Sequence, residues 1–180
     1  MASLRRLILL QLLLAAAALL MGCRDDEANG WNEVTSSEGR FSVSLPGEAT
    51  YSSEAVEAPS SKSTVHHWRA ETESGKTAYS VSYNDLPGLP LEGKAAKEFL
   101  ASQIPPDFNL VNERAVSVGR DPGREIEARA MLDGTPLFMT ARFFLVKNRF
   151  YQLVIIREGG PVDENSRTKM FDSFGLLPEE

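Results

Sequence analysis

Beyond residue 30 the chain alternates between apolar and polar residues with a period of two, which is typical of half-buried β-strands. The segment 41–45 shows this most clearly, because Phe41, Val43 and Leu45 fall on one face. Clusters of Gly, Pro, Asn, Asp and Ser separate such segments. The pattern predicts nine strands, over residues 31–35, 41–45, 51–58, 64–71, 77–83, 109–118, 124–132, 137–146 and 150–157.

Two segments change to the spacing of a helix. Apolar residues recur three and four positions apart from Leu91 to Ile104, and Pro105-Pro106 then ends the pattern, because proline cannot continue a helix. A closing helix is predicted over residues 162–174.

Several of the later strands have no polar face. Leu137-Phe138-Met139, residues 143–146 and residues 153–156 are apolar on both sides, and such strands must be covered on both sides. With short hairpin turns between strands, we predict an α+β fold: a central antiparallel sheet with helices on both faces, an α/β/α sandwich. An all-β barrel is the alternative, but it gives the two helices no place.

The first 22 residues have the pattern of an export signal rather than of a folded segment. Arg5 and Arg6 precede an apolar run from Leu7 to Met21, and the small residue Gly22 follows it. The run is shorter than the roughly 20 residues that span a bilayer, and the sequence after it is polar. An uncleaved membrane helix is the alternative. Removal of residues 1–22 leaves 158 residues, which suits one domain, predicted over residues 31–177.

Charge and cysteine content narrow the classes of function. Without Arg5 and Arg6 the chain has 17 basic and 25 acidic residues, a net charge of −8, so nucleic acid is not an expected partner. The single cysteine, Cys23, rules out an intramolecular disulfide.

The residues around that cysteine resemble a bacterial lipobox. Leu20, Met21 and Gly22 precede Cys23 at the end of the apolar run. The resemblance implies a diacylglyceryl group on the Cys23 thiol, cleavage before Cys23, and acylation of the new amine. Two or three acyl chains hold a protein firmly on a membrane, whereas one does not.

Residues 23–30 would then form an acidic tether of at most roughly 25 Å. In Gram-negative lipoproteins an aspartate at the second mature position commonly marks retention in the inner membrane. The residue here is Arg24, which favours the periplasmic face of the outer membrane if the organism has one. Asp25 at the next position leaves the choice of membrane open.

The domain resembles the PsbP-like sandwich, a fold that includes the photosystem II PsbP domain and many small bacterial lipoproteins. The stretches that carry this resemblance are GRFSVSLPGEA from residue 39, SYNDLP from 82, GRDPGREIEAR from 119, RFYQLVI from 149 and FDSFGL from 171. The resemblance implies the fold and a small extracytoplasmic lipoprotein. It supplies no catalytic residue, since the family has no common reaction.

The histidines and paired glutamates that could form a metal or catalytic site are better explained by their positions on predicted strands. His66 and His67 are neighbours on a predicted strand, so their side chains point to opposite faces and cannot easily bind one ion. Glu125 and Glu127 alternate with Ile126, which indicates a solvated face rather than a catalytic carboxylate pair. We expect no catalytic residue, no metal and no other cofactor.

Two segments are candidates for a partner surface. The loop 84–90 contains Asp85, Leu86 and Leu89, and its two leucines could contact a partner or, as we favour, cap the core. Arg120 and Arg124 flank a predicted hairpin turn and could form a basic patch with Arg142.

We therefore expect a lipid-anchored accessory module that binds the membrane through its acyl chains and an unknown envelope protein or component through its domain. A small-ligand or metal carrier of the envelope is the alternative.

Overall fold

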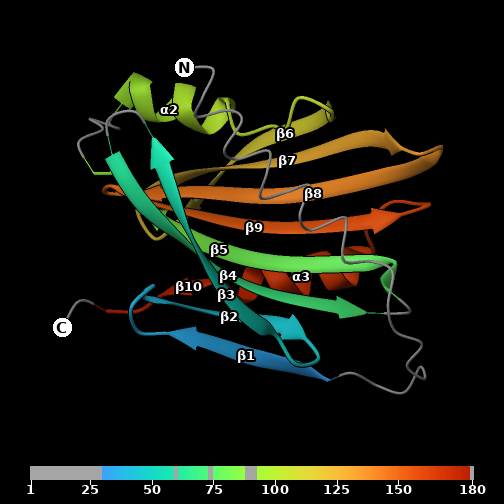
Figure 1. Ribbon diagram of the computed structural model, residues 1–180, viewed down its shortest axis with the longest axis horizontal. Helices are drawn as coiled ribbons and strands as arrows, with labels where there is room; N and C mark the ends of the chain where they lie inside the picture. The colour runs from blue at the N-terminus through green and yellow to red at the C-terminus, as the bar shows by residue number, and fades with distance from the viewer. Residues whose placement is uncertain (1–29, 59–60, 73–74, 88–92, 179–180) are drawn as a thin grey trace.

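The computed structural model describes residues 30–58, 61–72, 75–87 and 93–178 of the 180-residue chain (Figure 1). This part contains ten β-strands and two helices. In chain order they are β1 (Trp31–Ser36), β2 (Phe41–Pro46), β3 (Thr50–Ala58), β4 (Ser61–Thr72), β5 (Thr77–Asp85), α2 (Gly93–Ala101), β6 (Asn109–Val118), β7 (Asp121–Leu132), β8 (Thr135–Val146), β9 (Arg149–Glu158), α3 (Glu164–Ser173) and β10 (Gly175–Leu176). The nine strands and two helices expected from the sequence are all present, so the sequence pattern is confirmed at this level.

The strands form two antiparallel sheets instead of one. The larger has seven strands in the order β3-β4-β5-β9-β8-β7-β6, and the smaller has the order β1-β2-β10. The first hairpin therefore lies outside the central sheet, and a tenth strand joins it, with Leu176 opposite Phe41. The sequence pattern does not predict β10, because a strand of two residues has too few positions to show a period.

Two hydrophobic clusters lie on opposite faces of the seven-stranded sheet. Phe143 and Phe150 belong to one cluster, while their sequence neighbours Phe144 and Tyr151 belong to the other. Because successive side chains of a strand point to opposite faces, we name the two surfaces the Phe143 face and the Phe144 face. The prediction that these strands are buried on both sides is confirmed.

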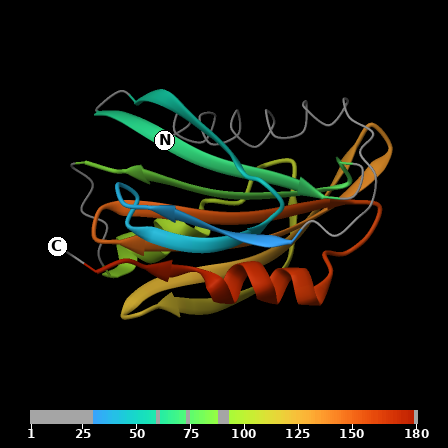
Figure 2. The same cartoon turned by 90° about the horizontal axis from the view of Figure 1, so that it is seen from below.

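Each helix belongs to a different cluster. Ala96 and Leu100 of α2 are buried in the cluster of the Phe143 face. Met170 and Phe171 of α3 are buried in the cluster of the Phe144 face, together with Phe41 and other residues of β2. Figure 2 shows α3 running beside the small sheet.

The two ends of the seven-stranded sheet differ in what they carry. At one end, the Gly30 end, β1 and β5 begin, β9 ends, and β7 turns into β8. At the other, the Asp85 end, β5 stops opposite the first residue of β9, and Gly119-Arg120 joins β6 to β7. In Figure 1 the β7–β8 hairpin and the start of β1 lie at the right-hand end.

Candidate functional site

The Asp85 end carries a bidentate ion pair between the last residue of β5 and the first of β9. Arg149 Nε lies 2.7 Å from Asp85 Oδ1, and Arg149 Nη2 lies 2.9 Å from Asp85 Oδ2. The remaining nitrogen, Nη1, donates to the Glu38 carbonyl at 2.6 Å. The hydrogen bonds to Asp85 raise the pKa of Arg149 above its usual value, and burial opposes this. This geometry fixes both charges at the edge of the domain.

Aromatic rings stack beneath this pair. The Arg149 guanidinium lies 4.7 Å from the centre of the Tyr83 ring, and the His66 ring stacks parallel to Tyr83 at 4.6 Å. The Tyr51 hydroxyl is 2.8 Å from His66 Nδ1, and half of the Tyr51 surface is exposed. We call Glu38, Tyr51, His66, Asp85 and Arg149 the distal surface.

The Tyr83 hydroxyl lies below this surface, buried and without a hydrogen-bond partner in the described part of the chain. Burial raises the pKa of Tyr83 to about 12, and the Glu38 carboxylate adds to this effect. The nearby Tyr151 differs, because its hydroxyl donates to the Gly39 carbonyl at 2.8 Å.

The histidines do not form a shared site. His66 lies in the aromatic stack, 4.0 Å from a Glu38 carboxylate oxygen, whereas the alternation along β4 directs His67 to the opposite face. Burial lowers the pKa of His67, and the nearby His66 lowers it further. Among the described residues, no group of three or more His, Cys, Asp or Glu side chains could hold a metal ion.

The distal surface combines an exposed tyrosine ring, fixed charges of both signs and hydrogen-bonding groups. Tyrosine and arginine are enriched at protein interfaces, where they supply large contacts with little loss of side-chain freedom. The chemistry of this end therefore suits recognition of another molecule.

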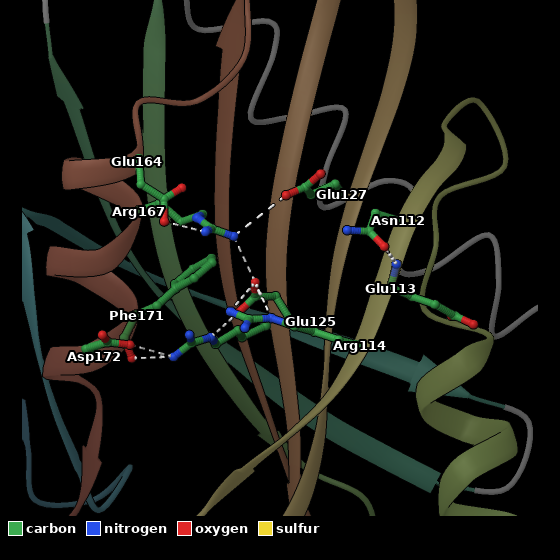
Figure 3. Close-up of polar contacts among 10 residues, drawn as sticks. Asn112, Glu113, Arg114, Glu125, Glu127, Glu164, Arg167, Phe171 and Asp172 are labelled. Atoms are coloured by element: carbon green, nitrogen blue, oxygen red, sulfur yellow. Dashed lines mark hydrogen bonds and ion pairs between the residues drawn. The ribbon is translucent and has the colours of Figure 1, made fainter.

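A second polar cluster lies on the Phe144 face, and Figure 3 shows it around Glu125. Glu125 accepts from Arg142 Nε at 2.5 Å, from Arg167 Nη1 at 3.0 Å and from both Arg114 Nε and Nη2 at 3.0 Å. Arg142 also bonds to the Phe171 carbonyl and to Asp172 at the end of α3. The cluster thus joins β6, β7, β8 and α3 through one carboxylate.

The expectation of a solvated face at Glu125 and Glu127 is wrong for Glu125, which is only 3 % exposed. The reason is that α3 places Arg167 over β7, a contact between residues 42 positions apart that the local pattern could not show. The Glu127 side chain is 44 % exposed and agrees with the expectation. Because three guanidinium groups bind the Glu125 carboxylate, this cluster is a structural connection between the helix and the sheet.

The structure separates most of the residues chosen as a partner surface. Asp85 is exposed on the distal surface, whereas Leu86 is buried in the cluster of the Phe143 face, so its side chain caps the core. Arg120 is exposed in the turn between β6 and β7. Leu89 lies outside the described residues, as do Cys23 and the residues Leu20, Met21 and Gly22 of the predicted lipobox.

The three arginines do not converge into one basic patch. Arg124 donates to the Leu100 and Ala101 carbonyls at the end of α2 and pairs with Glu113. Arg142 points to the other face, toward α3. Arg149 was not among the predicted site residues. Its partner Asp85 lies 64 positions away, on a strand whose pairing with β9 no local signal predicts.

Within the described part of the chain, no helix combines the length and the apolar content needed to cross a membrane.

Sequence comparisons give no relative: no family model matches the chain, and no curated protein matches it. Among solved structures, the chain is similar to the cyanobacterial PsbP protein (CyanoP) of Synechocystis sp. PCC 6803, with a TM-score of 0.52 and 15 % identity, over 88 % of this chain and 99 % of that one. This likeness shows a PsbP-like fold.

Two further structures score lower. A protein of Bacteroides thetaiotaomicron has a TM-score of 0.47 and 13 % identity, over 84 % of this chain and 50 % of that one. LpqN of Mycobacterium tuberculosis, which is involved in cell envelope biogenesis, has a TM-score of 0.39 and 11 % identity, over 88 % and 82 %. These scores are too low to support a comparison of function.

Proposed function

We propose that this protein is a lipid-anchored, extracytoplasmic accessory module of the bacterial envelope that acts by binding and not by catalysis. Residues 1–22 would be its signal peptide, lipidated Cys23 its anchor, residues 23–30 a tether and residues 31–177 its domain. The observation that carries the proposal is the Leu20-Met21-Gly22-Cys23 box, placed directly before a domain with a PsbP-like fold.

We assign the domain to the PsbP-like α/β/α sandwiches. In support, α2 contributes Ala96 and Leu100 to the cluster of the Phe143 face, while α3 contributes Met170 and Phe171 to that of the Phe144 face. The small sheet lies on the Phe144 face together with α3, so that layer contains strands as well as a helix.

The distal surface is the proposed site of binding. Its Asp85–Arg149 pair lies at the end of the sheet opposite Gly30, and the Tyr51 side chain extends from mid-sheet toward that end, where its hydroxyl meets His66. A partner could therefore reach this surface while the lipid holds the other end. The proposed partner is a protein or another envelope component with groups that complement both charges. If the organism is Gram-negative, Arg24 favours the periplasmic face of the outer membrane.

The proposed anchor is tested by intact mass and membrane fractionation of the protein in its native host. The expected mass is that of residues 23–180 plus acyl chains, and both the added mass and the membrane association should be lost in Cys23→Ala. Asn29→Ala is the matched control, since it changes the tether and keeps the box. A mature protein without lipid in the soluble fraction would contradict the proposal.

A further inference from the structure

Large hydrophobic side chains that are exposed gather at one end of the domain. In the described part of the chain there are five of them, and only Tyr51 lies on the distal surface. The other four are Leu110 (42 % exposed), Val111 (51 %), Met131 (67 %) and Leu132 (36 %). We call these four residues the tip patch.

The strand register places the tip patch at the Gly30 end. Thr77, the first residue of β5, lies in one transverse row with Arg157, Phe138, Arg129 and Asn109. Leu110 follows Asn109 directly in β6, and the hairpin of β7 and β8 continues beyond this row for three more residue pairs. The pairs are Ala130–Leu137, Met131–Pro136 and Leu132–Thr135.

The turn between β7 and β8 fixes the shape of the part of the hairpin that extends beyond this row. Asp133 has φ 49° and Gly134 has φ 82°, the two positive values that a type I′ turn requires. Such a turn joins strands tightly, so Met131 and Leu132 are held beside the tip and cannot fold back onto the core. Exposed apolar residues on a rigid, projecting hairpin indicate contact with something outside the domain.

The chain enters the domain at this same end. The Trp31 ring packs edge-on against Tyr79 at 5.7 Å, and Tyr79 is only two residues from the start of β5. From Trp31, β1 runs toward the Asp85 end, so Gly30, where the described part of the chain begins, lies at the same end of the domain as the tip patch. Only six residues, 24–29, lie between Cys23 and Gly30, and the seven steps from Cys23 to Gly30 reach at most about 25 Å.

We propose that the tip patch contacts the lipid bilayer in which Cys23 is anchored, so that the Gly30 end faces the membrane and the distal surface faces away. This inference rests on the proposed lipid anchor. The short tether keeps the Gly30 end near the bilayer, and β7 lies three strands, about 14 Å, from β5 in the sheet. Both the tether and the hairpin can therefore reach one membrane surface.

The charges near the patch favour the apolar part of the interface over anionic headgroups. Near the patch, Arg129, Lys76 and half-buried Arg157 are balanced by Asp133, Glu158 and Glu127. Basic clusters are what anionic lipids attract, and none is formed by these side chains. The contact should therefore depend on insertion of Met131 and Leu132 and only weakly on anionic lipid.

The test uses the lipidated mature protein, in which the Cys23 thiol is consumed and an introduced cysteine is the only free thiol. Met131→Cys carries an environment-sensitive fluorophore at the tip, and Arg120→Cys carries it in the exposed turn at the opposite end. Both proteins are reconstituted in phosphatidylcholine vesicles and separated by flotation. The label at residue 131 should give a blue-shifted, several-fold brighter emission that brominated lipid quenches. The label at residue 120 should keep the emission spectrum of a fluorophore exposed to water.

Three outcomes would overturn the inference. Protein that floats with the vesicles but shows a water-like label at residue 131 retains the anchor and excludes membrane contact by the tip. A blue shift that brominated lipid does not quench, and that grows with protein density, assigns the patch to a second copy of the chain. Protein that does not float lacks the anchor, which refutes the proposed function and with it this inference.

Discussion

Arg142 on β8 lies directly opposite Glu125 on β7, and its Nε donates to the Glu125 carboxylate at 2.5 Å. The same guanidinium lies 4.9 Å from the centre of the Phe171 ring and bonds to the Phe171 carbonyl. One arginine thus connects a buried carboxylate in the sheet to the helix that covers it. The buried Glu125 carboxylate, together with the exposed Asp172 carboxylate, offsets the free-energy cost of burying this guanidinium.

We expect Glu125→Gln to lower the free energy of unfolding by about 3 kcal/mol, because half-buried Arg142 and Arg167 lose the buried carboxylate that they share and keep only exposed partners, among them Asp172 and Glu164. Urea unfolding of the mature domain measures this change. Glu127→Gln is the matched control on the same strand, and its exposed ion pair should contribute less than about 1 kcal/mol. Equal effects of the two substitutions would show that the Glu125 cluster does not stabilise the fold.

The two tyrosine hydroxyls near Gly39 should respond differently to removal. Tyr151→Phe loses a buried hydrogen bond to the Gly39 carbonyl and should destabilise the domain by about 1 kcal/mol. Tyr83→Phe removes a hydroxyl without a partner in the described part of the chain and should be neutral or stabilising. Urea unfolding of the two variants measures both changes. If Tyr83→Phe lowered the free energy of unfolding by more than about 1 kcal/mol, the Tyr83 hydroxyl would have a hydrogen-bond partner in solution.

The raised pKa of Tyr83 also predicts a loss of stability at high pH. Between pH 10, the usual pKa of a tyrosine, and about pH 12, the folded value, the unfolded chain loses a proton that the folded chain keeps. Ionisation then favours the unfolded state, so the free energy of unfolding should fall as the pH rises through this window. Since lysines and other tyrosines titrate there too, the measurement is the difference between the original protein and Tyr83→Phe. Parallel pH profiles would contradict the assignment.

The sequence predicted this domain well where structure is local. The period-two segments and the Asp133-Gly134 turn depend on neighbouring residues, and these elements are present. The contacts that build the sites join distant positions: Asp85 with Arg149, and Glu125 with Arg167. Which strands pair, and which face a helix covers, depends on the packing of the whole chain, so the pattern around Glu125 looked like that of an exposed strand.

Gly123 on β7 packs so closely against β8 that its position has no room for a larger side chain, which the sequence pattern does not predict. A Cβ at Gly123 would lie 2.3 Å from Phe144 Cδ1 and 2.7 Å from the Phe143 carbonyl oxygen. Gly123→Ala should therefore destabilise the domain by about 2 kcal/mol or more, because the backbone atom cannot move aside easily. Gly160→Ala is the control, since nothing lies within 4 Å of its added Cβ. Similar unfolding free energies for the two variants would contradict the close packing of β7 against β8.

Under the proposed lipid anchor, the residue after Cys23 should control which membrane holds the protein. If the proposed anchor is correct, Arg24→Asp places an aspartate at the second mature position and should move the protein from the outer to the inner membrane of a Gram-negative host. Separation of the two membranes on a density gradient, followed by detection of the protein, measures the shift. Asn29→Asp is the control, because it also adds a negative charge to the tether but leaves Arg24 in place. If Asn29→Asp caused the same relocation, the charge of the tether, and not the residue at the second position, would determine the membrane to which the protein is sorted. If neither variant moved, Arg24 would not be the signal that favours the outer membrane.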